Sequence, residues 1–100
     1  MKITGYFSTG EVYVNGKWLD PAPSQELWNH SPTGFMWGYG GSGPAQLALA
    51  ILLRATSRDR ALKYHQQFKW EIIAALPQAD FEININVAKW VEEHRVGEHQ

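Results

Sequence analysis

Apolar and polar residues alternate over the first part of the chain. The segments 2–7 and 11–15 are rich in Tyr, Val, Ile and Phe, and a Gly-containing break at 8–10 separates them. Such alternation is typical of half-buried strands, and a short break between two of them is typical of a hairpin. The pattern therefore predicts a β-hairpin, and Asn15-Gly16 predicts a second turn that leads into a short third strand at 17–19.

Residues 20–39 alternate less regularly and contain several turn-forming residues. Two prolines within 20–24 predict a loop, because proline cannot donate to a strand ladder. Short strands are predicted at 26–29 and 35–39. A turn at 30–34, which contains Pro and Gly, would join them.

An almost continuous apolar run extends from Pro44 to Ala55. Pro44 suits the first position of a helix, where its missing N–H costs no hydrogen bond. Gly43 is the expected N-cap, and Gln46 is placed to bond back to the backbone of the cap. Since this helix is apolar on every face, we predict that helix 44–55 is the buried central element of the core.

Two further helices and a strand are predicted after this run. Ser57 caps a helix that continues to Leu76, with inward-facing residues at helical spacing: Ala61, His65, Phe68, Ile72 and Ala75. A strand is predicted at 81–85, although the strand could instead end at Ile83, with Asn84 as the cap of the last helix. In both cases four residues at helical spacing predict a C-terminal helix: Val87, Trp90, Val91 and His94.

The predicted order places strands first and helices later, which is typical of an α+β fold. We expect a small antiparallel sheet with two to three helices packed on one face. Residues 1–96 should form a single globular domain, and residues 97–100 a frayed tail.

Composition narrows the class of protein. The chain has 100 residues, of which 44% are hydrophobic, so it can bury a core and is not disordered over most of its length. The formal net charge of −1 does not favour a duplex-binding protein, which is usually basic. The absence of cysteine excludes disulfides and thiolate zinc sites. No apolar run is long enough to span a bilayer, so we expect a soluble cytoplasmic protein without a membrane partner.

The densest pattern of the chain lies between Asn29 and Ala50. It reads NHSP, then GF, then WGYGGSGPAQLALA. This pattern resembles the signature of a small uncharacterised family found in bacteria, phages and mobile elements. The family has no assigned activity, so the resemblance implies a common fold and a phage or mobile-element setting. The family commonly has acidic residues at the positions of Thr33 and Met36, so any chemistry of those acids is absent here.

The Gly-rich loop of this segment is the first candidate site. It precedes a helix, whose first N–H groups and dipole favour an anion or the acidic side chain of a partner. We expect an anion- or partner-binding site made by the loop and its neighbours: His30, Trp37, Tyr39, Gly40, Gly41, Ser42 and Gly43. No Lys follows the glycines, so the loop is not a nucleotide P-loop. The alternative is that the glycines only let the chain turn tightly into the helix.

An imidazole lies beside a hydroxyl at His30 and Ser31, which suggests nucleophilic catalysis. However, adjacent residues seldom align as base and nucleophile, and no carboxylate is placed to orient the histidine. The alternative is a turn in which these side chains bond nearby backbone.

His94 and His99 are five residues apart rather than four, which does not suit two metal ligands on one helix face. The sequence therefore predicts no catalytic residue, no metal and no cofactor.

A run of basic residues spans the joint between two predicted helices: Arg54, Arg58, Arg60 and Lys63. With exposed aromatic side chains nearby, such a patch could hold a nucleic-acid backbone. The alternative is that these basic side chains are only solvated at the corner between the two helices.

Five tryptophans cannot all be fully buried in so small a domain, and Trp70 lies off the inward-facing stripe of its helix. Since Trp is enriched at interfaces, an exposed aromatic patch would mark a partner site.

These features favour a non-enzymatic accessory protein that binds a macromolecular partner. We expect that partner to be a protein rather than a nucleic acid. In the setting implied by the resemblance, it could be an inhibitor of host defence of the anti-CRISPR kind, an inference by association. The alternative is a small-ligand module that holds an anionic or nucleotide-like ligand at the Gly-rich loop.

Overall fold

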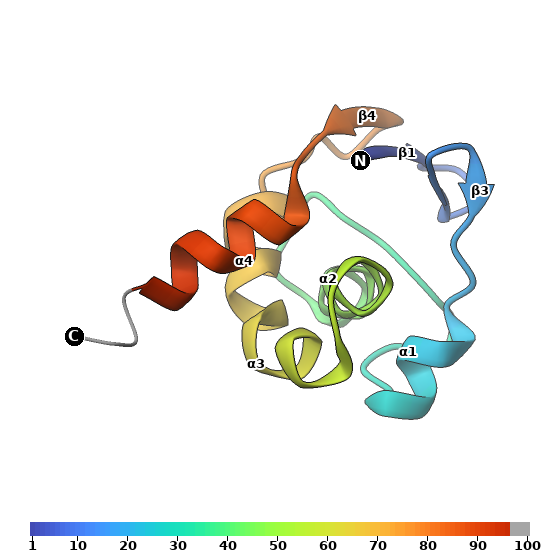
Figure 1. Cartoon of the computed structure of the whole chain (residues 1–100). Helices are drawn as coiled ribbons and strands as arrows, with labels where there is room; N and C mark the ends of the chain where they lie inside the picture. Colours follow the sequence, from blue (N-terminus) through green and yellow to red (C-terminus); the bar gives the residue numbers. More distant parts are fainter. Residues whose placement is uncertain (97–100) are drawn as a thin grey trace.

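A four-stranded antiparallel sheet forms one layer of the molecule in a computed structural model, which describes residues 1–96 (Figure 1). Three strands come from the N-terminal part of the chain, β1 (Lys2–Tyr6), β2 (Glu11–Val14) and β3 (Lys17–Trp18). The fourth, β4 (Phe81–Asn84), comes from the C-terminal part. The strand order is β3-β2-β1-β4, so β3 and β4 are the two edges of the sheet.

The predicted N-terminal hairpin and third strand are confirmed. Ile3 lies opposite Val14, and both are buried together with Val12, so this face of the hairpin packs on the helices. Asn15 and Gly16 have φ angles of 51° and 80°, as a two-residue turn that follows the twist of the strands requires. The alternation in the sequence therefore sets both the strands and the face that they bury.

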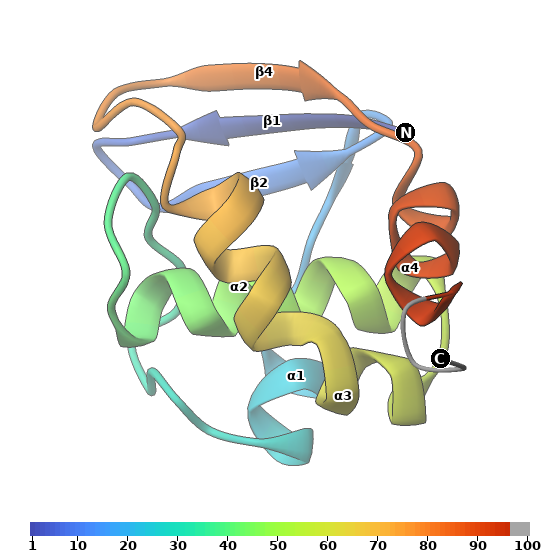
Figure 2. The ribbon, with the colours of Figure 1, turned by 90° about the vertical axis from the view of Figure 1, so that its left-hand side faces the viewer.

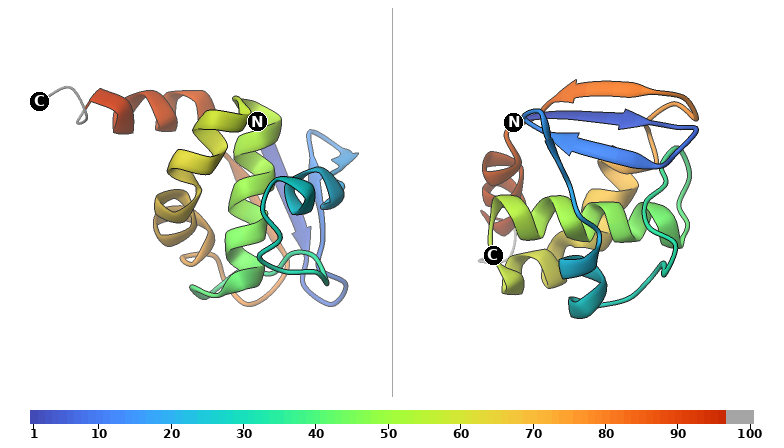
Figure 3. Two further views of the ribbon diagram at one scale, coloured as in Figure 1. Left: turned by 90° about the horizontal axis from the view of Figure 1, so that it is seen from below. Right: turned by 90° about the vertical axis from the view of Figure 1, so that its right-hand side faces the viewer.

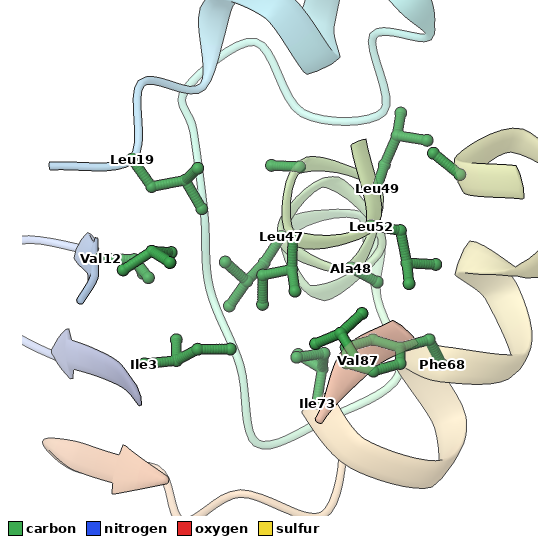
Figure 4. Close-up of a cluster of buried hydrophobic side chains, with 14 of the residues drawn as sticks. Ile3, Val12, Leu19, Leu47, Ala48, Leu49, Leu52, Phe68, Ile73 and Val87 are labelled. Atoms are coloured by element: carbon green, nitrogen blue, oxygen red, sulfur yellow. The ribbon is translucent and has the colours of Figure 1, made fainter. Parts of the chain in front are cut away.

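Helix α2 (Ser42–Ala55) runs beneath the sheet and forms the centre of the core (Figures 2 and 4). Most of its residues are buried, which confirms the predicted central helix. Figure 4 shows Leu47 on the side of Val12 and the sheet, and Leu52 on the opposite side, toward Phe68. A helix that contacts other elements on opposite sides needs apolar residues all round.

The prediction of a loop at 20–24 is wrong, because a helix, α1 (Ala22–Leu27), begins there. Its two prolines lie at the start, where the first N–H groups of a helix have no intrahelical partner. The Asp20 carboxylate accepts a hydrogen bond from the Ala22 amide at 2.9 Å, which further favours this start. The prolines therefore open a helix.

The predicted strands at 26–29 and 35–39 are also wrong. The chain between α1 and α2 is irregular and wraps around the start of α2 (Figure 3). Phe35 and Trp37 are buried there, and the Trp37 indole N–H donates to the Ala79 carbonyl at 2.9 Å. These aromatic residues fill the core from a loop, so their alternation with less buried residues does not indicate a strand.

The next helical segment is split into an α-helix and a π-helical turn. Helix α3 (Arg58–Phe68) is capped by the Ser57 hydroxyl as predicted, but it does not continue to Leu76. It passes at Phe68 into the π-helical turn η1 (Lys69–Ile73). A π turn inserts one residue and rotates the side chains beyond it around the helix axis, and such turns are frequent at functional sites.

The C-terminal part gives the edge strand and the last helix, α4 (Val87–Val96). The strand ends at Asn84, one residue before the predicted Ile85, and the alternative in which Asn84 caps the last helix is wrong. Asn86 is the cap, since its side-chain oxygen accepts from the Lys89 amide at 3.0 Å. Figure 2 shows all helices on one side of the sheet, so the predicted α+β class is confirmed. The predicted frayed tail, 97–100, lies outside the described residues.

Candidate functional site

One buried side chain, Gln46, fixes the segment that leads into the candidate site. Its Oε1 accepts hydrogen bonds from the amides of His30 and Ser31 at 2.7 and 3.0 Å. Its Nε2 donates to the Ser24 hydroxyl at 2.9 Å and to the Trp28 carbonyl at 3.2 Å. The prediction that Gln46 bonds back to its own cap is therefore wrong. The side chain instead holds the loop that carries Trp28 and His30.

His30 and His65 face each other across the gap between this loop and α3, with their Nε2 atoms 3.0 Å apart. The Nδ1 atom of His65 lies 3.0 Å from the carbonyl oxygens of both Ala61 and Leu62, so it carries the proton and donates to them. The neutral His65 ring then has a lone pair on Nε2, and His30 donates its Nε2 proton to it. Trp28 stacks on the His30 ring at 4.4 Å between centroids.

Both histidines are held in the neutral form. Burial is the main cause that lowers the pKa of His30, and the neighbouring His65 and Lys69 lower it further. Burial also lowers the pKa of His65, against the opposing effect of its bonds to the Leu62 and Ala61 carbonyls. The pair therefore adds donors and acceptors to this site at neutral pH without adding charge.

Lys69 is the charged group of the site. It lies one helical turn beyond His65, and only 7% of its surface is exposed. Its ammonium donates to the Gly40 carbonyl at 3.4 Å and lies 4.4 Å from the centroid of the Trp70 ring. Within residues 1–96, no carboxylate forms an ion pair with Lys69. A buried ammonium that holds one long hydrogen bond and one aromatic face retains capacity for an anion.

The glycines of the loop are explained by the rings that cover them. A Cβ atom on Gly40 would overlap the end of the Trp70 ring, and one on Gly41 would overlap the Tyr39 ring. Neither glycine has a positive φ, so close approach of a ring, rather than backbone conformation, requires the absence of a side chain. The predicted N-cap, Gly43, is wrong, because α2 begins at Ser42 and Gly41 is its N-cap. The loop is therefore a support for two aromatic side chains.

Pairwise contacts link a set of residues, which we call the aromatic–cation face: Trp28, His30, Tyr39, Lys69 and Trp70. Its three large aromatic side chains are exposed by 50%, 45% and 61% for Trp28, Tyr39 and Trp70. Exposed aromatic rings around a buried cation are a composition typical of binding sites. The exposure of Trp70 that its helix position predicts is confirmed.

The structure separates the sequence-predicted site residues. His30, Tyr39, Gly40 and Gly41 belong to the aromatic–cation face or support it, whereas Trp37 is fully buried. The prediction that Trp37 contacts a ligand is therefore wrong, because its ring is part of the core.

The other two loop residues, Ser42 and Gly43, border a second feature. It is a hollow of about 290 Å³ next to the start of α2. Ser42 is exposed, and Gly43 is buried against Met36. Several hydroxyl-bearing side chains line the hollow, and none of the lining residues is charged: Ser8, Thr9, Ser31, Thr33, Tyr39 and Ser42.

His30 and Ser31 are not arranged as base and nucleophile. The Nε2 atom of His30 is hydrogen-bonded to His65, and the Ser31 hydroxyl lies 3.4 Å from the Thr33 hydroxyl.

No three His, Asp or Glu side chains gather to hold a metal ion in the described part of the chain. The basic run is exposed at the end of α2 and along α3: Arg54, Arg58, Arg60 and Lys63. None of the helices in residues 1–96 is long and apolar enough to cross a membrane.

The sequence alone does not identify His65 and Lys69 as site residues. Helical spacing places His65 on an inward face, and Lys69 has no partner nearby in the chain. The residues that they contact, His30 and Gly40, lie 35 and 29 positions away. One signal is available in the sequence: Lys69 lies directly between two large aromatic residues, Phe68 and Trp70.

The comparisons with known proteins identify a family but no activity. Residues 4–93 match the model of a family of unknown function (DUF6166), and the chain belongs to this family. No curated protein and no solved structure matches the chain.

Proposed function

We propose that this member of a family of unknown function is a binding module, and that it contacts a protein partner through the aromatic–cation face. The observation that carries the proposal is Lys69, a lysine residue that is only 7% exposed and has no carboxylate partner in residues 1–96. Burying an ammonium without a counter-charge opposes folding. Retention of such a group is expected where a ligand supplies the missing charge.

The surroundings of Lys69 suggest the chemistry of the partner. An Asp or Glu side chain of the partner would approach Lys69 and could accept a further bond from the face, while apolar groups would cover the rings of Trp28 and Trp70. Such an arrangement resembles an interface centre, where aromatic anchors surround a desolvated charge pair. A partner protein with a carboxylate next to exposed apolar side chains therefore fits the face best.

Affinity purification from a lysate of the source organism tests this proposal with three variants. Trp70→Ala and Trp28→Ala remove rings of the face, and Trp18→Ala removes a comparably exposed ring (53%) from the far edge of the sheet. We expect a stoichiometric partner that is retained by the wild type and by Trp18→Ala, and lost by at least tenfold with either other variant. Loss with Trp18→Ala alone, or no stoichiometric partner, would contradict the proposal.

A narrower form of the proposal concerns the biological setting. The resemblance suggests a phage or mobile-element protein, and a small protein of that kind could act by occupying a surface of a host defence protein, as an anti-CRISPR does. The supporting feature is the aromatic–cation face. Identification of the captured partner tests this assignment, since a partner outside host defence would contradict it.

The hollow next to α2 supports a second candidate function, the binding of a small polar ligand. Hydroxyl groups line it, and the first N–H groups of α2 lie at its wall. A thermal-shift panel of inorganic phosphate and nucleotides tests it, since a ligand at 100 times its Kd adds about 2.7 kcal/mol to stability. Ser42→Glu should abolish the shift by placing a competing carboxylate there. No shift with any compound would remove this candidate.

A further inference from the structure

Among residues 1–96, no strand pairs with the outer side of the edge strand β4. Its pairing with β1 continues one residue beyond the strand, where Met1 and Ile85 exchange both main-chain bonds at 3.0 and 2.9 Å. In an antiparallel pair, bonded residues alternate along the strand. Ile83 and Phe81 therefore also bond to β1, and the backbone N–H and C=O groups of Glu82 and Asn84 point to the free side.

An apolar groove runs along the same edge. It has a volume of about 320 Å³ and lies between β4 and the segment around η1, lined mainly by aliphatic side chains: Ile72, Ala75, Leu76, Ile83 and Ile85. Phe81 faces the core and is buried, whereas Ile83 and Ile85 on the same face of the strand are only half-buried. An incoming strand would therefore find free main-chain groups and, below them, an uncovered apolar surface. Figure 2 shows no further element beyond β4.

We propose that a second copy of this chain occupies this edge, with β4 of one copy antiparallel to β4 of the other. The two copies would be related by a twofold axis through Ile83, and the sheet would continue across the interface. In this register Glu82 of each copy exchanges main-chain bonds with Asn84 of the other. The two Ile83 side chains meet over the groove, where each covers apolar surface of the other copy.

The side chains on the outer face favour this register over its neighbours. It places the Glu82 carboxylate opposite the Asn84 amide of the other copy, which can donate to it. A register centred on Glu82 would instead place two carboxylates directly opposite each other, which is unfavourable. Lys2 already lies 3.4 Å from Glu82, so the carboxylate is partly compensated within its own copy. The edge is therefore self-complementary in main-chain hydrogen bonding and in the pairing of its outer side chains. It shares no residue with the aromatic–cation face.

Sedimentation of the full chain at concentrations up to about 1 mM tests the proposal, since this range detects dimers with a Kd as weak as about 1 mM. We expect a monomer–dimer equilibrium for the wild type. Asn84→Pro should give a monomer with an unchanged circular dichroism spectrum, because it removes an outward N–H and no bond to β1. Asn84→Ala, which keeps that N–H, is the matched control and should still form dimers.

A pair of charge variants tests the register without changing the backbone. Asn84→Glu places a carboxylate opposite Glu82 of the other copy and should raise the dimer Kd, whereas Asn84→Lys should lower it. Hydrogen exchange gives a direct readout: the amides of Glu82 and Asn84 should become protected as concentration rises, and the amide of Tyr13 should not change. A wild type that stays monomeric leaves the edge to another occupant, such as an extended peptide of a partner, and overturns the proposal. Dimers that persist in Asn84→Pro also overturn it.

Discussion

At the residue scale, two buried polar side chains decide how the site is held. Gln46 is fully buried among the apolar residues of α2, yet both ends of its amide are bonded, so its burial is compensated. Lys69 is buried with only one long hydrogen bond and no counter-ion among the described residues. The contrast separates a structural polar residue from one whose environment is incomplete without a ligand.

Gln46→Leu should destabilise the protein by about 2–3 kcal/mol. The variant leaves the buried amides of His30 and Ser31 without acceptors, and an unsatisfied buried group costs about 1–3 kcal/mol. Chemical denaturation measures the loss. Gln66→Leu, at an exposed position of α3, is the control and should change stability by less than about 0.5 kcal/mol. Equal effects of the two variants would show that Gln46 does not hold the loop.

Stability should fall as the pH drops below the ordinary histidine pKa of 6.5. Because folding lowers the pKa of both His30 and His65, the unfolded chain binds more protons in this range, and protonation favours unfolding. The loss should level off once the pH passes the lowered pKa values of the folded pair. Denaturation midpoints at several pH values measure the slope.

His30→Gln removes one member of the pair and should reduce the slope. His94→Gln serves as the control, since His94 contacts Glu71 rather than the pair, and it should leave the contribution of the pair in place. A slope that is unchanged in His30→Gln would contradict the assignment.

Gly40→Ala should lower partner binding far more than stability. The added methyl overlaps the end of the Trp70 ring, which is exposed and can swing away at a cost below about 1 kcal/mol. The displaced ring then no longer presents its face to a partner. Binding of the captured partner and denaturation are measured together, with Ser42→Ala as the control. A variant that loses stability but binds normally would show that Trp70 is not a contact.

At the element scale, regular patterns predict the structure well and irregular segments do not. The N-terminal hairpin agrees with the alternation of residues 2–15, which is typical of strands buried on one face. Helix α2 agrees with the apolar run 44–55, which is typical of a helix buried on all sides. The prolines of α1 indicate a loop in the sequence, because their position relative to a helix start is invisible before the helix is known. The turn to a π-helix at Lys69 likewise has no local signal.

The site depends on the elements that the sequence does not predict. Trp28 follows α1, Tyr39 lies in the irregular loop, and Trp70 lies in η1. His30, Tyr39 and the glycines can be found from the sequence because they are near each other in the chain. His65 and Lys69 cannot, since only the packing of α3 against the loop brings them close. The prediction for Trp37 fails because burial of an aromatic residue in a loop depends on tertiary contacts.

At the scale of the whole molecule, two surfaces are available for binding: the aromatic–cation face and the outer side of the edge strand β4. The helices cover one face of the sheet (Figure 2), and the aromatic–cation face shares no residue with the groove along β4. A dimer formed through β4 would carry two such faces. If the partner is itself multivalent, the two sites would bind it with an avidity above that of either alone.

The central claim is that Lys69 is retained for a ligand rather than for folding, and the free energy of unfolding of Lys69→Met tests it most directly. The variant keeps an unbranched side chain of similar length and removes the ammonium. Burying an ammonium without a counter-charge opposes folding, and the ring of Trp70 offsets only part of that cost. We predict that Lys69→Met is as stable as the wild type or more stable, by denaturation at neutral pH. A loss of about 2 kcal/mol or more, as for a residue of the core, would contradict the account.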